Sequence, residues 1–274
     1  MPQFPLHILE TPQEIAHVEE LQRLVWPGSE TEVVPAHMLQ SIVSNGGLII
    51  GAFDGEQLVG FVFGFPGWHA AQDGLRPKHC SHMAGVHPDF RNAGLGFALK
   101  RAQWQMVRSQ GLDHITWTYD PLLSRNANLN MVKLGAVCST YIPNYYGDMR
   151  DELNAGLPSD RFQVDWWLNS KRVNRRLSGH RRRRLSLSHY TESGVQIIAP
   201  STPAPSDPLL LLEIPSDFLA LKAADPALAL EWRLRTREIF TDLFARGYLI
   251  TDFIYQTGSQ PRGFYMLSHG ESRM

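Results

Sequence analysis

Apolar residues near the amino end of the chain recur every three or four positions, which is the spacing of an amphipathic helix. These residues are Ile15, Val18, Leu21 and Val25. The segment Thr11-Pro12-Gln13-Glu14 comes just before them and is typical of a capping box with proline in the first turn. We therefore expect a helix from Thr11 to about Trp26, and a second helix from about Pro35 to Val43.

Further along, apolar runs alternate with turn signals in a way that predicts strands. Residues 46–54 and 57–67 are two such runs separated by Asp54-Gly55-Glu56, so we expect an antiparallel hairpin, followed by a loop up to His79. Further strands are expected at residues 80–87, 114–119, 136–142 and 161–168, and further helices at residues 94–110 and 124–134. The face of the first of these helices would be Leu95, Leu99, Ala102 and Met106. This order predicts an α/β alternation around one sheet.

The chain then changes character over residues 171–207. A basic run is followed by closely spaced prolines, which is typical of a solvated linker. The basic residues are Lys171, Arg172, Arg175, Arg176 and Arg181–Arg184. We therefore expect a first domain at residues 1–170, a linker at 171–207 and a carboxy-terminal extension at 208–274.

The extension has its own pattern of elements. A strand at 209–214, a helix from Asp225-Pro226 to Gly247 and strands at 248–255 and 263–267 are predicted. Three roles remain open for this segment: it extends the main sheet, covers a site of the first domain or forms the contact of a homodimer.

Composition adds few constraints. Apolar residues make up 43% and charged residues 19% of the 274-residue chain, an ordinary globular profile. Two cysteines are too few for a disulfide framework or a zinc cluster, so we expect no metal. We see neither a signal peptide nor an apolar stretch long enough to span a bilayer, and we expect a cytoplasmic protein without a membrane partner. Because no aromatic residue interleaves Arg181–Arg184, we expect no nucleic-acid partner.

The segment Arg91-Asn92-Ala93-Gly94-Leu95-Gly96 lies between a predicted strand and a predicted helix. Glycine lets the backbone turn tightly there, and the first N–H groups of the helix point outward with the positive end of its dipole. Such a turn favours an anion such as a diphosphate. Positive charge nearby agrees with this interpretation, from Arg91, Lys100, Arg101 and Arg108. A Gly-x-Gly pair by itself would favour a plain strand-to-helix turn over a ligand site.

The wider pattern of a strand, Val86-His87-Pro88, Arg91-x-x-Gly94-x-Gly96 and a helix resembles the acetyl-CoA motif of the GNAT acyltransferase superfamily. Residues 116–136, 144–162 and 164–168 also look like a branch of this superfamily with a carboxy-terminal extension. The resemblance implies an α/β (α+β) GNAT fold: a central mixed, mostly antiparallel sheet with splayed strands, flanked by helices, plus a small C-terminal α/β extension. It also implies an acyl-CoA-dependent N-acyltransferase.

The resemblance further implies the donor site, for acetyl-CoA or another acyl-CoA. Backbone amides of the loop would hold the CoA diphosphate, namely those of Arg91, Asn92, Ala93, Gly94, Leu95 and Gly96. Backbone groups of Ala84, Gly85 and Val86 would pair with pantetheine. Asn126 would also contact pantetheine, although a stricter alignment puts Ser124 there, and Asn126 is equally suited to capping its own helix.

For catalysis, the family position of a carboxylate base is occupied by His82, whose ordinary pKa near 6.5 suits proton abstraction; a histidine held at the sheet surface is the alternative. The tyrosine that commonly protonates the leaving thiolate is replaced by Met131. Tyr146 is our candidate for that role, with Tyr141, Tyr145 or water as alternatives.

The acceptor side is the least constrained by the sequence. Arg150 and Arg161 lie in or beside the loop between the last two strands and are candidates for clamping a carboxylate. We therefore expect a small-molecule amine acceptor such as an amino acid, and an acetyl or succinyl group as the acyl group. The alternative function is a non-catalytic acyl-CoA-binding sensor or regulatory module.

Overall fold

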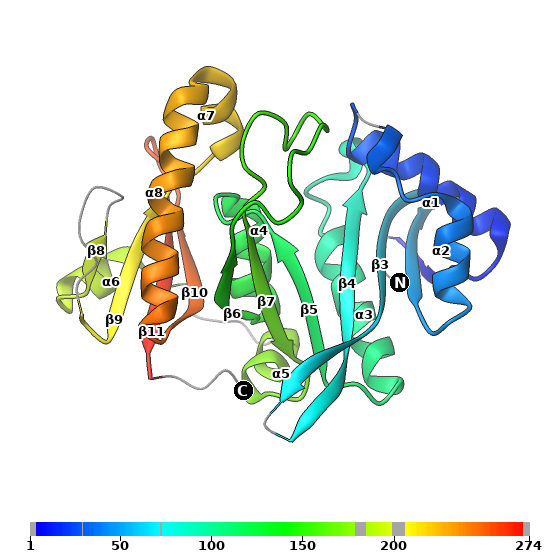
Figure 1. The fold of residues 1–274 in the computed structure, drawn as a ribbon, viewed down its shortest axis with the longest axis horizontal. Coiled ribbons are helices and arrows are strands. Elements are labelled where there is room, and N and C mark those ends of the chain that lie inside the picture. Colours follow the sequence, from blue (N-terminus) through cyan, green and yellow to red (C-terminus); the bar gives the residue numbers. More distant parts are fainter. Residues whose placement is uncertain (1–3, 29, 72, 179–184, 199–205, 271–274) are drawn as a thin grey trace. The chain divides into compact units, whose positions relative to one another are not determined.

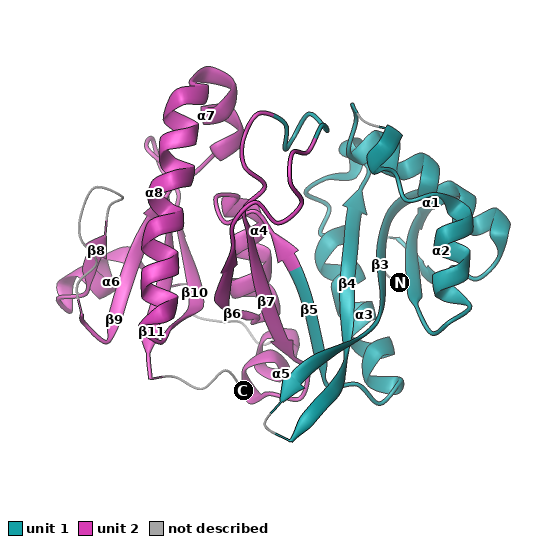
Figure 2. Cartoon of the chain, in the orientation of Figure 1, with its two compact units in different colours: residues 1–117, 150–155 teal, residues 118–149, 156–274 magenta. Residues whose placement is uncertain are grey.

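The computed structural model describes the chain except for residues 1–3, 29, 72, 179–184, 199–205 and 271–274 (Figure 1). The chain divides into two compact units (Figure 2). Unit 1 comprises residues 1–117 and 150–155, and unit 2 comprises residues 118–149 and 156–274. The domain boundaries drawn from the sequence stay a prediction, and Arg181–Arg184 lie outside the described residues.

Unit 1 is a sheet with helices on both faces. Its strands are β1 (Leu6–Ile8), β2 (Leu48–Asp54), β3 (Gln57–Ala71), β4 (Gly74–Val86) and the first part of β5 (His114–Tyr119). Its helices are α1 (Pro12–Val25), α2 (Ala36–Val43) and α3 (Leu95–Ser109), with short 3₁₀ turns at Glu30–Glu32 and Pro88–Phe90. The strand order is β1-β2-β3-β4-β5, and only the β4–β5 pairing is parallel.

Helix α1 forms as the sequence predicts. The Thr11 side chain accepts from the Glu14 N–H, and the Glu14 carboxylate in turn accepts from the Thr11 N–H at 3.1 Å, which is the expected capping box. The four apolar positions of the helix are buried. They pack with Leu39 of α2 and with Phe61 and Phe63 of β3 in one hydrophobic core.

Two glycines show which helices cover which face of this sheet. A Cβ atom at Gly60 would lie 3.2 Å from Leu99 of α3, whereas one at Gly85 would lie 3.3 Å from Trp26 and from Val25, at the end of α1. Gly60 pairs with Val86, and Gly85 pairs with Phe61, so neighbouring positions of these strands point to opposite faces. Helix α3 therefore covers one face, and α1 covers the other.

The predicted loop between residues 68 and 79 is wrong. Strands β3 and β4 continue as a two-stranded ribbon, with Trp68 opposite Pro77 and Ala70 opposite Leu75. An ion pair of 2.6 Å links Asp73 in the turn to Arg76 of β4. Proline and glycine at Pro66, Gly67 and Pro77 obscure the strand pattern in the sequence, but a ribbon with exposed edges tolerates them.

Unit 2 contains the remaining elements. Its strands are the end of β5, β6 (Val137–Ile142), β7 (Arg161–Trp167), β8 (Gln196–Ile198), β9 (Leu209–Ile214), β10 (Tyr248–Gln256) and β11 (Arg262–His269). Its helices are α4 (Ser124–Ala127), the π-helix η3 (Asn128–Leu134), α5 (Lys171–Leu177), α6 (Leu187–Glu192), α7 (Phe218–Ala224) and α8 (Pro226–Ala245). The strand order is β7-β6-β10-β11-β9-β8.

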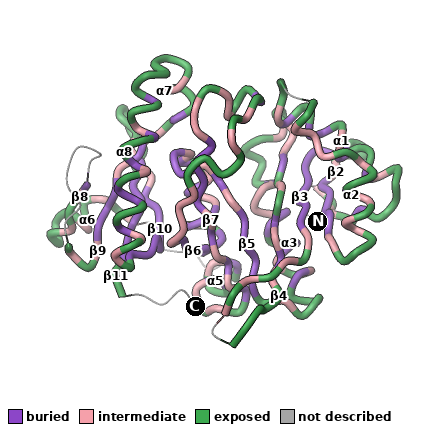
Figure 3. Tube along the Cα trace, in the orientation of Figure 1, coloured by how far each residue is buried: buried purple, intermediate pink, exposed green. Residues whose placement is uncertain are grey.

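The carboxy-terminal extension continues the sheet that contains β6. Ile250 of β10 pairs with Cys138 of β6, and β11 and β9 follow antiparallel to one another. Helix α8 packs on these strands, and its Phe240 ring contacts Tyr141, Phe162 and Tyr265. Of the three roles left open by the sequence, the structure thus shows the first. Much of the length of these strands is buried (Figure 3).

The first half of the predicted basic linker is ordered. Ser170 caps α5 by accepting from the Val173 N–H, and Val173 and Leu177 are buried. Arg176 donates to the Val132 carbonyl at 2.8 Å and forms a buried ion pair with Asp252, also at 2.8 Å. Periodic burial of Val173 and Leu177 therefore prevails over the charge pattern, and the solvated-linker prediction is wrong for residues 171–177.

Candidate functional site

The turn before α3 has the geometry that the sequence predicts. Gly94 is the N-cap of α3 with φ 82°, and Asn92 also adopts a positive φ of 75°. Residues from Arg91 to Gly94 are exposed, and a Cβ atom at Gly94 would meet nothing within 4 Å. The turn therefore leaves open space in front of the helix terminus.

Backbone N–H groups face this space without partners. Arg91 N–H donates to the Pro88 carbonyl at 3.2 Å, and Ala93 N–H makes a long contact of 3.4 Å with the Phe90 carbonyl. In the described part of the chain, no hydrogen bond uses the remaining N–H groups of the loop. These belong to Asn92, Gly94, Leu95 and Gly96. Four free donors at the positive end of a 15-residue helix are suited to an anion.

The positive charges near this turn differ from those expected. Arg91 and Arg101 are exposed, so they can contribute to the field at the loop. Arg108 lies near the other end of α3, with its guanidinium 4.6 Å from the centre of the Trp104 ring. Lys100 is only 4% exposed and points into the protein, so its predicted contribution to the surface charge is wrong.

One edge of β4 is open beside the loop. His87 N–H donates to the Val59 carbonyl at 2.9 Å, so the alternation of an antiparallel ladder turns the backbone groups of Val86 and Ala84 to the other edge. In the described residues, β4 pairs with β5 only at His79 and Cys80. Ala84 and Val86 therefore present backbone donors and acceptors that no β5 residue occupies. Gly85 instead points its backbone groups toward β3.

His82 is the extra residue of a β-bulge in β4. Phe63 pairs with Met83 and Gly64 pairs with Ser81, so His82 has no opposite residue on β3. Its ring lies against Phe63 at 6.1 Å and Phe65 at 5.9 Å between centroids, on the face covered by α1. His82 keeps an exposed surface, but partial desolvation of its ring lowers its pKa, so the imidazole is neutral at pH 7 and is able to accept a proton.

The predicted residues on α4 lie in unit 2. Ser124 is buried, and its hydroxyl donates to the Pro215 carbonyl at 2.8 Å. Asn126 is partly exposed, and its side chain makes no hydrogen bond to any residue that the structure describes. Leu123 is the N-cap of α4 and provides no side-chain cap. Asn126 is therefore not a helix cap, and its amide is available to a ligand.

Tyr146 and Arg161 also lie in unit 2, in contact with one another. The Tyr146 hydroxyl is 2.9 Å from the Thr118 hydroxyl, and the side chain is 43% exposed. The Arg161 guanidinium lies 5.3 Å from the centre of the Tyr146 ring, and it donates to the Asp160 carbonyl and to the Met149 sulfur. Arg161 is 6% exposed, so it is a buried contact of the loop between β6 and β7.

Arg150 belongs to the segment 150–155, which packs in unit 1. Its N–H donates to the Glu32 carboxylate at 2.6 Å, and Glu152 N–H donates to the Pro27 carbonyl at 3.1 Å. The side chain of Arg150 is exposed. Of the two predicted carboxylate clamps, Arg150 is thus the one with an accessible cation.

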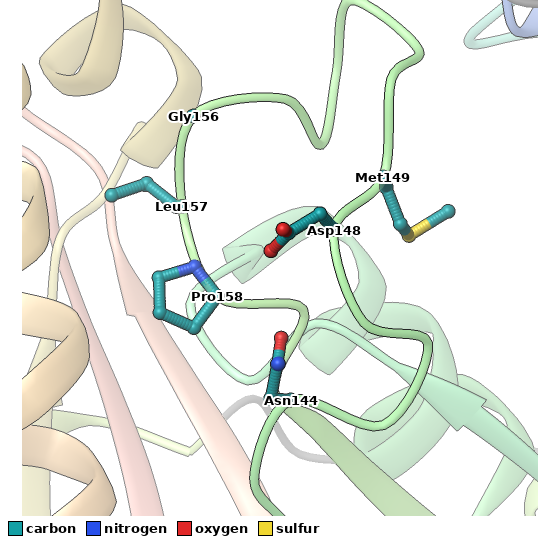
Figure 4. A pocket seen from close by; sticks show the side chains of 6 residues that line it. All are labelled: Asn144, Asp148, Met149, Gly156, Leu157 and Pro158. Atoms are coloured by element: carbon teal, nitrogen blue, oxygen red, sulfur yellow. The ribbon is translucent and has the colours of Figure 1, made fainter.

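A pocket of about 340 Å³ lies in the loop between β6 and β7, within unit 2 (Figure 4). It is lined by Asn144, Asp148, Met149, Gly156, Leu157 and Pro158. Figure 4 shows the Asp148 carboxylate and the Asn144 amide directed toward the space enclosed by the loop. Asp148 is exposed and makes no hydrogen bond within the described residues, so the pocket has one available negative charge.

Sequence reasoning missed the group that holds this loop in place. Asp160 is fully buried and accepts from Tyr141 at 2.6 Å, from Asn144 N–H at 2.9 Å and from Arg237 of α8 by two bonds of 2.8 Å. Burial alone would raise the pKa of Asp160, but these donors outweigh it and the pKa is lowered. A pair 77 residues apart has no local sequence signal, so only the fold reveals it.

No group of histidine, cysteine, aspartate and glutamate side chains among the described residues has the arrangement of a metal site. None of the helices described here is both long and apolar enough to cross a membrane.

Comparison with known proteins adds a family match. Residues 15–135 match the model of the Acetyltransferase (GNAT) family. The chain is similar in fold to the ribosomal-protein-S18-alanine N-acetyltransferase from Escherichia coli, with 15% identity and a TM-score of 0.45 over 61% of this chain and 95% of that chain. No curated protein matches the sequence.

Two further solved structures show a similar degree of likeness. Ard1 from Thermoplasma volcanium has 19% identity and a TM-score of 0.44, over 60% of this chain and 96% of that chain. Arabidopsis thaliana Naa50 in complex with the bisubstrate analogue CoA-Ac-MVNAL has 16% identity and a TM-score of 0.46, over 60% and 97%. Identities this low concern the fold alone.

Proposed function

Residues 15–135 form a GNAT acetyltransferase domain, and from this premise we propose that the chain transfers an acyl group from acyl-CoA to the nitrogen of a small amine. The observation that supports this most directly is the set of four unpartnered N–H groups at the start of α3. A diphosphate suits them, because its oxygens accept from several N–H groups and its charge interacts favourably with the helix dipole. Acetyl-CoA is the donor we expect, with succinyl-CoA as the alternative.

The residues present fit such a donor. The open space beside Gly94 accommodates the diphosphate, and Arg91 adds positive charge at its rim. The open edge of β4 at Ala84 and Val86 offers hydrogen bonds of the kind that a pantetheine amide makes. The pantetheine contact expected of Asn126, which belongs to unit 2, stays a prediction.

His82 is the base of the proposed reaction. Its lowered pKa keeps the imidazole neutral at pH 7, so it takes a proton from the acceptor ammonium and frees the nitrogen lone pair. The bulge at His82 also frees backbone N–H groups of β4 from regular pairing, and such a donor would stabilise the oxyanion formed when the amine attacks the thioester. Tyr146 remains the sequence-based candidate for protonating the thiolate.

The acceptor is a small amine in this proposal. The Asp148 carboxylate in the pocket of unit 2 favours an ammonium group, because an opposite charge in a partly closed space stabilises it. The carboxylate clamp expected at Arg150, which belongs to unit 1, stays a prediction. An amino acid carries an ammonium group of the kind that Asp148 favours, which agrees with the acceptor class expected from the sequence.

Binding and turnover test this function separately. Millimolar CoA should raise the melting temperature of the full-length protein, and acetyl-CoA with a panel of amino acids and diamines should release free thiol above the rate without acceptor. A missing thermal shift with CoA, acetyl-CoA and succinyl-CoA would contradict the donor site. The Gly94→Val variant should lose the shift, since its side chain would enter the space in front of the helix.

A second candidate function is an acyl-CoA sensor without turnover. It is favoured by Met131, which is fully buried at the place where related enzymes carry the acidic tyrosine. Tight CoA binding together with thiol release at background level, over the whole amine panel and both acyl donors, would support the sensor and overturn the enzyme.

A further inference from the structure

A buried polar cluster lies beneath α3, in the interior of unit 1. The Lys100 ammonium donates to the Ser81 hydroxyl at 2.9 Å and to the Gln103 carbonyl oxygen at 2.8 Å, and it lies 3.8 Å from the centre of the Trp117 ring. Lys100 and Ser81 are each 4% exposed, and Gln103 is fully buried. A lysine held in this way costs desolvation energy, so its retention calls for an explanation.

The cluster lies where β4 and β5 separate. The last residues paired between these strands are Cys80 and Thr116, and the contacts of Lys100 are the next residues along each strand, Ser81 and Trp117. The Lys100 amine therefore bridges the two strands at the base of the fork between them. The open edge of β4 that we assign to pantetheine begins at the same point.

Lys100 and His82 lie on opposite faces of the sheet next to the point where β4 and β5 separate. Ser81 pairs with Gly64, and the contact of Ser81 with Lys100 places its side chain on the face covered by α3. His82 lies against Phe63 and Phe65, on the face covered by α1. A thioester placed along the edge would thus have a proton acceptor on one side and a proton donor on the other.

We propose that Lys100 is the proton donor to the CoA thiolate as it leaves, an inference that rests on the proposed acyltransferase function. The acceptor nitrogen, after losing its first proton to His82, forms a bond to the acyl carbon, and the carbon–sulfur bond breaks. The sulfur electron pair takes a proton from the Lys100 ammonium. The nitrogen loses its second proton, and one of the two protons released restores Lys100 while the other goes to solvent.

The surroundings of Lys100 suit this role. Burial lowers the pKa of Lys100 well below the ordinary value for lysine, and Cys80 nearby acts in the opposite direction. An acid is most effective when its pKa is near the working pH, so a lysine with a lowered pKa is better suited than an exposed one.

His79 determines how the Gln103 side-chain amide is oriented. Burial, with a smaller effect of Lys100, lowers the pKa of His79 from 6.5 to about 3, so its ring stays neutral. The Gln103 amide nitrogen lies 3.1 Å from His79 Nε2 and donates to it, which turns the Gln103 carbonyl oxygen toward Lys100. The His79–Gln103 pair therefore accepts from Lys100 and does not compete for the same proton.

The test compares Lys100→Met with Lys78→Met, a matched change at a half-buried lysine of β4. Acetyl-CoA turnover is followed by thiol release across pH, and CoA affinity by calorimetry. For Lys100→Met we expect kcat to fall about a hundredfold, while the Kd for CoA is retained. The wild-type kcat should also decline at high pH as Lys100 loses its proton, and this decline should be absent in Lys100→Met. Lys78→Met should behave as the wild type.

Several outcomes overturn the proposal. A purely structural Lys100 would change the melting temperature and the Kd for CoA but leave the decline of kcat at high pH in place. Loss of that decline in Tyr146→Phe, with its retention in Lys100→Met, would assign the donor to Tyr146. Should the wild type bind CoA and release no thiol with any amine, the acyltransferase function fails first and the role of Lys100 falls with it. An unstable Lys100→Met is replaced by Ser81→Ala, which should shift the decline to a different pH while CoA affinity is kept.

Discussion

The first turn of α3 and the turn that follows it differ in almost every property, although they adjoin in one helix. The first turn is exposed or partly exposed around Gly94 and Gly96 and leaves its N–H groups without partners. Further along α3, Lys100 and Gln103 are buried against Ser81 and His79, and hydrogen bonds join Lys100 to Ser81 and Gln103, and Gln103 to His79. An open, pre-formed anion site thus adjoins a closed polar cluster. The sequence alone suggests a role for the exposed turn at Gly94, whereas the polar cluster around Lys100 is apparent only from contacts in the folded structure.

The largest effect is expected from a test of the open turn. Gly94→Val should weaken CoA binding about a hundredfold, because the new side chain fills the space in front of four N–H groups. Gly111→Val is the control, since Gly111 has φ 80° against 82° for Gly94 and is equally open, but lies beyond the other end of α3. Both variants should lose roughly 1–2 kcal/mol of stability from backbone strain. Equal CoA affinity in the two variants, measured by calorimetry, would contradict a diphosphate site at the start of α3.

The closed cluster should be sensitive to a single added methyl group. A Cβ atom at Gly64 would lie 2.2 Å from His79 Nε2 and 2.5 Å from the Cys80 carbonyl oxygen. We expect Gly64→Ala to lower the free energy of unfolding by about 2–3 kcal/mol, measured by urea denaturation. Gly67→Ala on the same strand has nothing closer than 3.9 Å and should change stability by less than about 1 kcal/mol. Similar losses in both variants would contradict tight packing of the cluster.

The pH dependence of stability tests whether His79 stays buried and neutral. Its pKa is about 3 in the folded chain and 6.5 ordinarily, so below pH 6.5 the unfolded chain binds more protons than the folded one. Stability from this group is present above pH 6.5 and is lost as pH falls toward 3, at up to about 1.4 kcal/mol per pH unit. The His79→Gln variant should lack this component. Parallel stability curves for the two proteins between pH 6.5 and 4 would show that His79 is accessible to protons.

The smallest effect concerns the rim of the open turn. Arg91→Gln should weaken CoA binding about threefold, and less at high salt, because an exposed charge contributes under about 1 kcal/mol and is screened. Arg108→Gln, near the far end of the same helix, should leave the affinity unchanged. Isothermal titration at low and high salt measures both. An equal loss in the two variants would mean that the general field of the protein, and not the loop, attracts the diphosphate.

Much of the fold follows from local sequence rules. The capping box at Thr11, the turn at Gly55 and the cap at Gly135 each need only a few neighbouring residues, and the elements form where these signals predict them. These local signals give a wrong prediction where the fold buries charged residues that their composition would place at the surface. Lys100 was assigned to the surface by its charge, and residues 171–177 were assigned to a linker, yet both are held by contacts with residues distant in sequence.

The sequence by itself determined the loop from Arg91 to Gly96, because glycine placement and the start of a helix specify an anion site within a dozen residues. Only the tertiary structure decided which residues lie around the proposed site. His82 sits at a bulge set by pairing with β3, Lys100 reaches the fork between β4 and β5, and Arg237 holds Asp160 from 77 residues away. Local backbone preferences extend over a few residues, whereas burial and hydrogen-bond partners depend on which strands and helices the fold brings together.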